Sequence, residues 1–397
     1  MYSKKIENIS PSMTLELSAK VKELQSQGIE VINLTVGEPD FKTPSYIIDG
    51  AIRGISNGFT KYTATSGIIE LKKEIVKKFK EFNSIDYNSS NILVSTGAKQ
   101  CLFNAILAII EENDEVIIPA PYWVSYTEMV KISGGKSVII NTSPKNDFKV
   151  TVDELDKHLT DKAKLLILNN PNNPTGSVYS EEELLLIGNW AIANNIFIIS
   201  DEIYERLTYG CNHTSLACLG DEIKEKTITI SGFSKTYSMT GWRLGYCAAN
   251  EKLIKLMTSI QSHSTACANS IAQYAGYIAL LEEKNNPDIE YMISEFSMRR
   301  KIAIDFLLKN SRLDFIYPSG AFYIFIDISF LKNKIYKDQK LLKSSEIAKV
   351  LLNDYKVAVV PGEAFGNDDY IRISYATDEK SVSEGLNRLI QFEKSIR

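Results

Sequence analysis

From residue 91 onward, short apolar segments alternate with longer segments of helical pattern, and this rhythm constrains the fold more than any other feature of the chain. Apolar runs of four to seven residues separated by helices are typical of a mostly parallel sheet covered on both faces. We therefore expect an α/β domain. The expected strands are NILVST (91–96), EVIIPA (115–120), KSVII (136–140), KLLILN (164–169), IFIISDE (196–202), KTITIS (226–231) and RLGYCAA (243–249).

The rhythm changes beyond a long helical region at about residues 251–310. Later strands are expected at RLDFIYP, AFYIFID, KVAVVPG and DYIRISYA, with helices near 344–355 and 379–395. This α+β pattern, in a chain of 397 residues, indicates two domains rather than one core. We predict a large domain over residues 46–285 and a small domain formed by residues 1–45 and 286–397. The N-terminal arm is assigned to the small domain because one helix (15–28) and one short strand (31–37) cannot form a core alone.

Composition limits the kinds of partner that the protein can have. The net charge of −4 and the absence of a long Lys/Arg run argue against nucleic-acid binding. The longest apolar runs fall short of the ~20 residues that a membrane span needs. The opening residues MYSKKIENISPSM lack the apolar core of a signal peptide. We therefore expect a cytoplasmic protein that has no membrane partner.

Cysteines and histidines give no sign of a metal site. The five cysteines include no CxxC pair, and their odd number indicates free thiols. His158, His213 and His263 each lack a second histidine, a cysteine or an acidic pair at metal-ligand spacing. We predict no metal ion, and a structural or surface role for each histidine.

Polar clusters follow five of the expected strands at the point where each strand ends. In an open α/β sheet the ligand lies outside the carboxyl ends of the strands, so we expect these clusters to meet at one edge. Their convergence is harder to explain by chance than any single motif, and it predicts a ligand site there. The clusters are TGAKQ, PAPYW, NNPNNPTG, SDEIY and SGFSK.

Lys235 follows a strand that reads as buried, with Ser231, Gly232 and Ser234 before it. A lysine shielded from water at a sheet edge can have a lowered pKa and act as an amine nucleophile toward an aldehyde. Eight residues later, Arg243 offers a fork of donors that suits a phosphate. Taken alone, Lys235 would be read as a surface residue in a loop, and Arg243 as a residue at a strand start.

Asp201 ends the expected strand IFIIS, and Tyr204 follows three residues later. A buried carboxylate without a partner is strongly destabilising. A cationic group of a bound ligand would compensate it. The simpler alternative is a helix N-cap aspartate beside a packed tyrosine.

The stretch GFSKTYSMTGWRLG at 232–245 resembles the pyridoxal-attachment signature of class I aminotransferases along its whole length. The further motifs VGEPDF, KYTATSG, TGAKQ, PAPYWVSY, NNPTG, SDEIY and RISYAT appear in family order between about residues 9 and 390. The set is similar to the subgroup that contains bacterial aspartate aminotransferases. This resemblance implies a fold-type I enzyme with a mostly parallel, seven-stranded type of sheet, and pyridoxal 5'-phosphate (PLP) as its cofactor.

The resemblance also implies roles for individual residues. Lys235 is expected to hold the cofactor covalently and to move a proton between the substrate α-carbon and the cofactor. Asp201 is expected to face the ring nitrogen, and Tyr204 the 3′-oxygen. Asn173, which alone would indicate only a turn, is expected to donate to the same oxygen and to contact the substrate carboxylate. Trp123 resembles the aromatic that stacks on the pyridine face, with a core tryptophan as the alternative.

The cofactor phosphate is expected beyond TGAKQ, where the backbone N–H groups that open a helix suit an anion. Tyr62 resembles a tyrosine that reaches the phosphate of the neighbouring subunit, which implies a homodimer with shared active sites. The candidate phosphate ligands are Gly97, Ala98, Lys99, Ser231, Ser234, Arg243 and Tyr62.

Substrate binding is expected to involve both domains. Arg372 resembles the family's α-carboxylate-binding arginine, and a carboxylate fits an arginine bidentately. Lys99 resembles a lysine associated with the distal carboxylate, although a surface lysine is the alternative. Thr14 occupies a position shared with relatives that use prephenate. The predicted substrate-binding residues are Gly37, Trp123, Asn173, Arg372, Lys99 and Thr14.

Together these features imply an aminotransferase that moves the amino group of an L-amino acid, with aspartate preferred, to 2-oxoglutarate by a ping-pong mechanism. A prephenate or aromatic aminotransferase on the same scaffold is the alternative. A PLP-dependent C–S lyase and a non-catalytic PLP-binding regulator are remoter ones.

Overall fold

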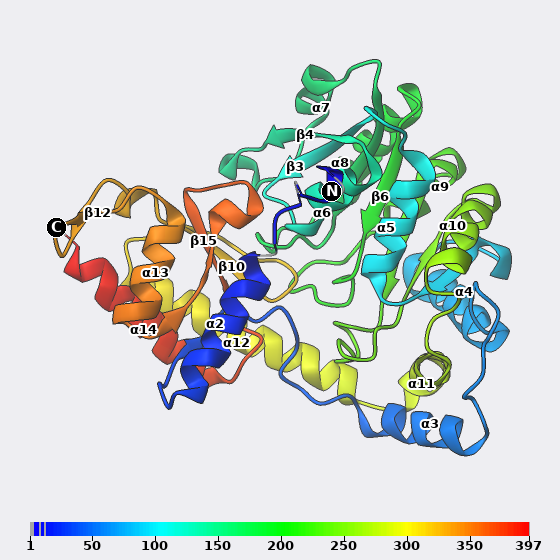
Figure 1. Ribbon diagram of the computed structural model, residues 1–397, viewed down its shortest axis with the longest axis horizontal. Coiled ribbons are helices and arrows are strands. Elements are labelled where there is room, and N and C mark those ends of the chain that lie inside the picture. Colours follow the sequence, from blue (N-terminus) through cyan, green and yellow to red (C-terminus); the bar gives the residue numbers. More distant parts are fainter. Residues whose placement is uncertain (1–3, 8, 12, 397) are drawn as a thin grey trace.

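The computed structural model describes residues 4–7, 9–11 and 13–396, which form two lobes (Figure 1). The larger lobe is built on a seven-stranded sheet with the order β2-β8-β7-β6-β5-β3-β4. All neighbouring strands are parallel, except that β8 runs antiparallel to both β7 and β2. The predicted α/β architecture is therefore confirmed. The strands are β2 (Ile92–Ser95), β3 (Glu115–Ala120), β4 (Lys136–Asn141), β5 (Ala163–Asn169), β6 (Phe197–Asp201), β7 (Thr227–Gly232) and β8 (Gly245–Ala248).

Helices cover both faces of this sheet because most of its strands carry apolar residues on both sides. In β5, Ile167 packs into the cluster on one face while Leu166 and Leu168 pack into the cluster on the other. The first face is covered by α5 (Ala98–Ile109), α6 (Ser125–Ser133) and α10 (Glu251–Ser264). The second is covered by α7 (Val152–His158), α8 (Glu181–Ala193) and α9 (Asp221–Lys226). Near β2, α11 (Ser270–Glu282) contacts α3 (Ser45–Ser56) and α4 (Ile69–Asn83).

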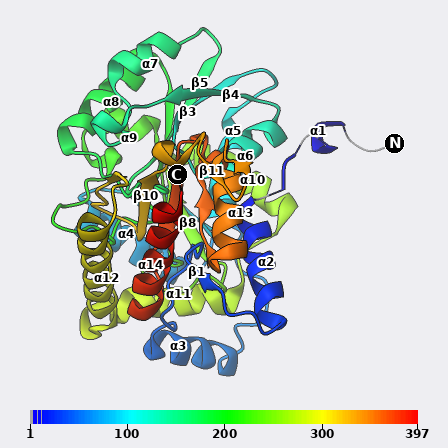
Figure 2. The same cartoon turned by 90° about the vertical axis from the view of Figure 1, so that its left-hand side faces the viewer.

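The smaller lobe contains an antiparallel sheet with the order β14-β15-β10-β9. Figure 2 shows this lobe from its outer end, where α12 and α14 lie beside one another. The lobe has the α+β character that the later part of the sequence predicts. Its elements are α12 (Asp288–Asn310), β9 (Phe315–Ile316), β10 (Tyr323–Asp327), β11 (Ile335–Tyr336), β12 (Gln339–Lys340), α13 (Ser344–Asp354), β13 (Val357–Ala358), β14 (Val360–Pro361), β15 (Tyr370–Ser374) and α14 (Glu379–Ser395).

The N-terminal arm contacts both lobes. Its strand β1 (Ile32–Asn33) pairs in parallel with β13 of the smaller lobe, preceded by helix α2 (Met13–Ser26). Helix α1 (Lys4–Glu7) instead contacts α6 of the larger lobe, where the backbone N–H of Ser10 donates to Glu128 Oε2 at 3.0 Å. The predicted domain boundaries at residues 46 and 285 stay predictions.

Some expected strands are shorter than their apolar runs. The strand predicted over 31–37 is reduced to β1, and the run 356–362 is divided into β13 and β14. That run is divided because its two halves join different sheets, with β13 beside β1 and β14 beside β15. The strand predicted from 243 begins at Gly245, since Arg243 has φ 53° and cannot continue an extended strand.

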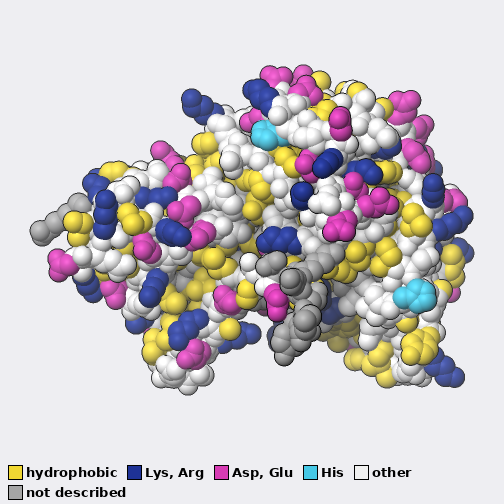
Figure 3. Space-filling view, turned by 45° about the horizontal axis from the view of Figure 1, so that its top comes forward, with side chains coloured by type: hydrophobic (Ala, Val, Ile, Leu, Met, Phe, Trp, Pro, Cys, Tyr) yellow, Lys and Arg dark blue, Asp and Glu magenta, His cyan; other side chains and the backbone are white. Residues whose placement is uncertain are grey.

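The face drawn in Figure 3 carries basic and acidic side chains interspersed over both lobes, in agreement with a net charge of −4. Among the described residues, no helix combines the length and the apolar character needed to cross a membrane.

Candidate active site

The five polar clusters lie at the same edge of the large sheet, as the strand directions require. Strands β3, β5, β6 and β7 are mutually parallel, and β2 runs in their direction because two antiparallel pairings separate it from β7. Asp201 is the last residue of β6, and Lys235 follows the end of β7 by three residues. The loops beyond β2, β3 and β5 carry the other clusters to this edge.

Asp201 is buried beneath the edge without a cationic partner. Asp201 is 4% exposed, and Tyr126 Oη donates a hydrogen bond to Asp201 Oδ2 at 2.7 Å. The backbone N–H of Ile203 donates to its other oxygen at 3.3 Å. Burial raises the pKa of Asp201 to about 6, against the opposing effect of these donors. Among the described residues no Lys, Arg or His forms an ion pair with it, so a protonated ring nitrogen fits this site.

Lys235 is the cation whose charge acts against the rise in the pKa of Asp201. Its Nζ donates to the carbonyl oxygen of Gly37 and lies 5.9 Å from the ring centre of Tyr204 and 6.0 Å from that of Phe322. Burial lowers the pKa of Lys235 to about 8, although the negative charge of Glu38 opposes the shift. A substantial neutral fraction near pH 8 makes this amine a competent nucleophile toward an aldehyde.

A cradle for an anion is formed at the N-terminus of α5. Gly97 precedes the helix with φ 80°, and a Cβ at this position would lie 2.6 Å from Arg243 Nη2. A Cβ at Gly245 would lie 2.2 Å from the backbone nitrogen of Ala98. Only glycine therefore lets the guanidinium and the N–H groups at the start of the helix approach each other this closely. These donors fit a phosphate.

The two serines predicted as phosphate ligands differ in position. Ser231 is buried, and its Oγ donates a hydrogen bond to Glu205 Oε1. Ser234 is buried directly before Lys235. The assignment of Ser231 and Ser234 to the phosphate stays a prediction.

Arg372 is a buried cation without a carboxylate partner among the described residues. It is 3% exposed, its Nη1 donates to Asn173 Oδ1 at 2.9 Å, and its Nη2 donates to the carbonyl oxygen of Thr35 at 2.8 Å. Its Nε is buried and has no hydrogen-bond partner among the described residues. The guanidinium lies 4.2 Å from the ring centre of Tyr323. Burial lowers the pKa of Arg372, and an incoming carboxylate would supply the missing counter-charge.

Lys99 and Trp123 belong to the larger lobe, whereas Arg372 belongs to β15 of the smaller lobe. Lys99 is exposed at the first turn of α5, and its Nζ lies 4.7 Å from the ring centre of Trp123. Trp123 packs edge-to-face against Tyr126 at 5.4 Å, and Tyr126 in turn bonds Asp201. Lys99 and Trp123 are therefore connected to the buried carboxylate through Tyr126.

Three predicted residues contribute differently. The loop carrying Gly37 approaches the site, because its carbonyl oxygen accepts the Lys235 hydrogen bond. Tyr62 is 89% exposed. Thr14 lies in α2, where its carbonyl oxygen accepts a hydrogen bond from Ser18 Oγ at 2.9 Å.

Two tyrosines that the sequence analysis missed complete the site. Tyr126 bonds Asp201, and its position three residues after Trp123 in PAPYWVSY is a signal that could have found it. Tyr323 Oη lies 2.9 Å from Tyr204 Oη. No sequence signal marks Tyr323, because it lies at the beginning of its strand, whereas ligand residues were sought at strand ends.

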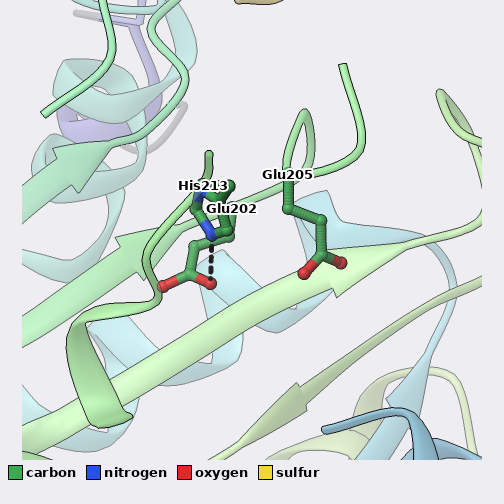
Figure 4. Close-up of side chains that lie close together, drawn as sticks. All are labelled: Glu202, Glu205 and His213. Atoms are coloured by element: carbon green, nitrogen blue, oxygen red, sulfur yellow. Dashed lines mark hydrogen bonds and ion pairs between the residues drawn. The ribbon is translucent and has the colours of Figure 1, made fainter. Parts of the chain in front are cut away.

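A second group of buried charges lies beside the site (Figure 4). Single ligand atoms of Glu202, Glu205 and His213 lie within 4.8 Å of one another. The expectation that no histidine lies near an acidic pair is therefore wrong for His213, because the fold joins it to residues 8 and 11 positions earlier. His213 Nε2 lies 3.0 Å from Glu202 Oε2, and Lys78 Nζ donates to Glu205 Oε1.

All four carboxylate oxygens of this group already accept hydrogen bonds. Besides His213, Glu202 accepts bonds from Ser200, Ser215 and the backbone of Leu216, all at its Oε1. Besides Lys78, Glu205 accepts bonds from Ser231 at Oε1 and from Asn83 at Oε2. We refer to Glu202, Glu205, His213 and Lys78 as the paired network, because each buried charge has a partner.

Comparisons with known proteins agree with this geometry. A family model described as aminotransferase class I and II matches residues 29–389. The chain is 44% identical to an aspartate aminotransferase of Bacillus subtilis over 98% of both chains. It is 41% identical to an aspartate/prephenate aminotransferase of Nitrosomonas europaea, again over 98% of both.

Solved structures with the same fold include aspartate aminotransferases. One from Rhizobium meliloti has a TM-score of 0.95 at 36% identity and covers 100% of both chains. One from Thermus thermophilus, solved with maleate, has a TM-score of 0.93 at 36% identity and covers 98% of this chain and 99% of the other. The family match over most of the chain, and relatives above 40% identity over nearly its whole length, show that this protein belongs to the class I and II aminotransferases and is a PLP-dependent enzyme.

Proposed function

We propose that the protein is an aspartate aminotransferase that transfers the amino group of L-aspartate to 2-oxoglutarate by a ping-pong mechanism. The observation that carries this proposal is the buried guanidinium of Arg372, which has neutral acceptors but no carboxylate among the described residues. A buried cation of this kind favours a ligand that brings a carboxylate. The names of the relatives support aspartate as that ligand.

The proposed roles of the large-domain residues follow from their surroundings. PLP, when bound, supplies an electron sink for the charge that develops at the substrate α-carbon. Asp201 keeps the ring nitrogen protonated, and Lys235 takes a proton at the α-carbon and returns it during turnover. The lowered pKa of Lys235 suits that task, since an amine with a pKa of about 8 is partly neutral near neutral pH.

Contacts around the ring and phosphate are proposed from the same geometry. Trp123 covers one face of the ring, while Asn173 and Tyr204 donate to its 3′-oxygen. The phosphate is bound at the start of α5 by the backbone of Gly97, Ala98 and Lys99, with Arg243 and Ser234 nearby.

Lys99 is proposed to bind the distal carboxylate of a dicarboxylic substrate. Its ammonium is exposed beside Trp123 and forms no ion pair among the described residues, so its charge is available. Arg372 then holds the α-carboxylate, with Gly37 and Asn173 beside it. The Thermus thermophilus relative was solved with maleate, which is a dicarboxylate, and this supports a site for two carboxylates.

Prephenate is the second candidate acceptor. The support is the name of the Nitrosomonas europaea relative, which joins the two activities, together with Thr14 and Lys99 in this chain. Prephenate also carries two carboxylates, so the proposed roles of Arg372 and Lys99 hold for both acceptors.

We also propose a cytoplasmic homodimer with shared active sites. Tyr62 is 89% exposed, and helix α3 nearby presents the exposed apolar side chains of Ile48, Ile52 and Ile55. A second copy of the chain would cover this apolar surface, and Tyr62 would then reach the phosphate of the partner subunit.

The proposed activity is tested with a panel of amino donors and acceptors. Aspartate, glutamate, tyrosine and alanine are each offered with 2-oxoglutarate, oxaloacetate or prephenate where the pair is productive, and the new amino and oxo acids are quantified. We expect aspartate with 2-oxoglutarate to give the highest kcat/KM. Glutamate with prephenate would be the second productive pair if the second candidate also holds.

Two outcomes separate the alternatives. A chain that forms no oxaloacetate from aspartate, but transaminates tyrosine, would contradict the aspartate assignment and leave the family intact. Release of ammonia, pyruvate and a thiol from a donor with a sulfur on its β-carbon, such as cystathionine, without an oxo-acid acceptor would instead indicate a C–S lyase.

A further inference from the structure

We propose that Tyr323 is a positioning residue that points the hydroxyl proton of Tyr204 toward the cofactor and supports the guanidinium of Arg372. Tyr323 comes from β10 of the smaller lobe, whereas Tyr204 lies just beyond the end of β6 in the larger lobe. The proposal rests on the proposed role of Tyr204 at the cofactor 3′-oxygen, and not on the identity of the amino acid substrate.

The first step of the argument is the location of Tyr323. It is 1% exposed, and its neighbour Phe325 pairs with Arg372 across the β10–β15 register. Since residues two apart in a strand share a face, Tyr323 and Arg372 project from the same side of the small sheet. Its ring then lies 4.2 Å below the Arg372 guanidinium, and its hydroxyl lies 2.9 Å from that of Tyr204.

The second step is the direction of the hydrogen bond between the two hydroxyls. Each hydroxyl carries one proton, and either could donate. Among the described residues, the Tyr323 hydroxyl has no hydrogen-bond partner other than Tyr204. A buried donor without a hydrogen-bond partner is strongly destabilising, so the Tyr323 hydroxyl is best oriented to donate its hydrogen bond to Tyr204 Oη.

The third step concerns the proton of Tyr204. Once Tyr204 accepts from Tyr323, its own proton needs a different acceptor, and the described residues offer none. Tyr204 is 4% exposed, so bulk water is not a ready acceptor for its hydroxyl proton. An oxygen atom of a ligand bound in the site would accept this hydrogen bond. Burial raises the pKa of both tyrosines, so both hydroxyls remain protonated donors at neutral pH.

The ring of Tyr323 contributes separately from its hydroxyl. A guanidinium over an aromatic face is attracted by the ring quadrupole, and this attraction is larger when the cation is desolvated. Arg372 is buried with an unpartnered Nε, so the ring is part of what keeps the charge in place before a carboxylate arrives. Tyr323→Phe therefore removes only the hydroxyl effect, whereas Tyr323→Leu removes both.

The test measures the bound cofactor directly, in the holoenzyme without substrate. A donor to the 3′-oxygen stabilises its anionic form, so weakening that donor raises the pH midpoint of the cofactor's visible absorbance band. Loss of the bond from Tyr323 weakens donation by Tyr204 through hydrogen-bond cooperativity. For Tyr323→Phe we expect the midpoint to rise by about 0.5 pH unit.

Two further variants make the readout specific. In a Tyr204→Phe background, adding Tyr323→Phe should move the midpoint no further, because the effect passes through Tyr204. Tyr375→Phe is the matched control, since Tyr375 is a buried tyrosine of the same lobe whose hydroxyl donates to the Ala321 carbonyl oxygen at 3.1 Å. Its midpoint should equal that of the wild type.

Maleate titration separates the ring from the hydroxyl. Maleate is used as a non-reacting dicarboxylate, and its Kd should change less than twofold for Tyr323→Phe but rise about fivefold for Tyr323→Leu. An unchanged or lowered absorbance midpoint for Tyr323→Phe, or a shift that persists in the Tyr204→Phe background, would overturn the proposal. These readouts stay valid even if aspartate is not the substrate, so the two proposals fail separately.

Discussion

Two groups of buried charged side chains lie side by side in this protein. The members of one group have no ion-pair partner among the described residues, whereas the members of the other are paired with one another. Asp201 and Arg372 are buried and Lys235 is partly buried around the site, and none of them forms an ion pair within the described residues. Glu202 and Glu205, from the same short segment as Asp201, belong to the paired network with His213 and Lys78. Asp201 and Glu202 are adjacent in sequence, so the difference arises from the direction of each side chain.

The pKa shifts express the same contrast. At the edge burial dominates, which raises the pKa of Asp201 to about 6 and lowers that of Lys235 to about 8. In the paired network burial would shift each pKa in the same direction as at the edge, but the attraction between Lys78 and Glu205 outweighs the effect of burial. The pKa of Lys78 is raised and that of Glu205 is lowered. Unpaired buried charges are expensive to keep, so they indicate a site completed by a ligand, whereas paired ones indicate structure.

Substitution of Lys235, which has no ion-pair partner, should have the largest effect of the changes considered for the two groups. We expect Lys235→Ala to lower kcat/KM by at least about 10⁴-fold, because both the covalent attachment and the proton transfer are lost. Folding should be retained, since no ion pair is removed. The measurement is steady-state kinetics together with thermal unfolding, and near-normal turnover would contradict the assignment.

Substitutions in the paired network should change the free energy of unfolding. Lys78→Met leaves Glu205 buried without its cation, and we expect a loss of about 3–5 kcal/mol in the free energy of unfolding. The double variant Lys78→Met, Glu205→Gln removes both charges and should recover most of that loss. Urea denaturation of the three proteins measures this. Equal stability of the single variant and the wild type would mean that the network is not paired as described.

Asp201→Asn tests the cost of the unpaired carboxylate. In protein stripped of PLP, a pKa raised from 3.8 to about 6 gives a contribution to stability that is fully present below pH 3.8 and is lost as pH rises through 6. The variant should therefore be more stable than the wild type by about 2–3 kcal/mol at pH 7, and the two should converge near pH 4. Unfolding free energies across this range provide the measurement. A difference independent of pH would sink the idea.

The smallest expected effect is at the exposed lysine. Lys99→Ala should lower kcat/KM for aspartate by about 2–5-fold, because an exposed ion pair contributes little. Tyrosine and alanine, which lack a distal carboxylate, should be unaffected. Kinetics with the three donors measure this, and equal losses for all of them would defeat the proposed contact.

The sequence located most of the candidate site because those residues are marked locally. Lys235, Asp201, Asn173 and Gly97 each lie at or just beyond the carboxyl end of a strand, and parallel strands bring such ends to one edge. The strands themselves were predictable from apolar runs that are buried on both faces. Arg372 was found through its resemblance to a family motif rather than through its place at an edge.

The residues that the sequence did not reveal depend on long-range contacts. Tyr126 is 75 positions from Asp201, and Tyr323 is 119 positions from Tyr204. His213 reaches Glu202 only because the loop between them folds back. A single sequence carries no local pattern for such pairs, since each partner alone resembles an ordinary core residue.

By itself, then, the amino-acid sequence determined the alternation of strands and helices, the edge where the polar loops meet and the family motifs on those loops. Only the tertiary structure decided which buried charges are paired and which are left for a ligand, as in the adjacent residues Asp201 and Glu202. The physical reason is that strand formation follows local periodicity, whereas the pairing of a buried charge depends on which distant segments pack against it.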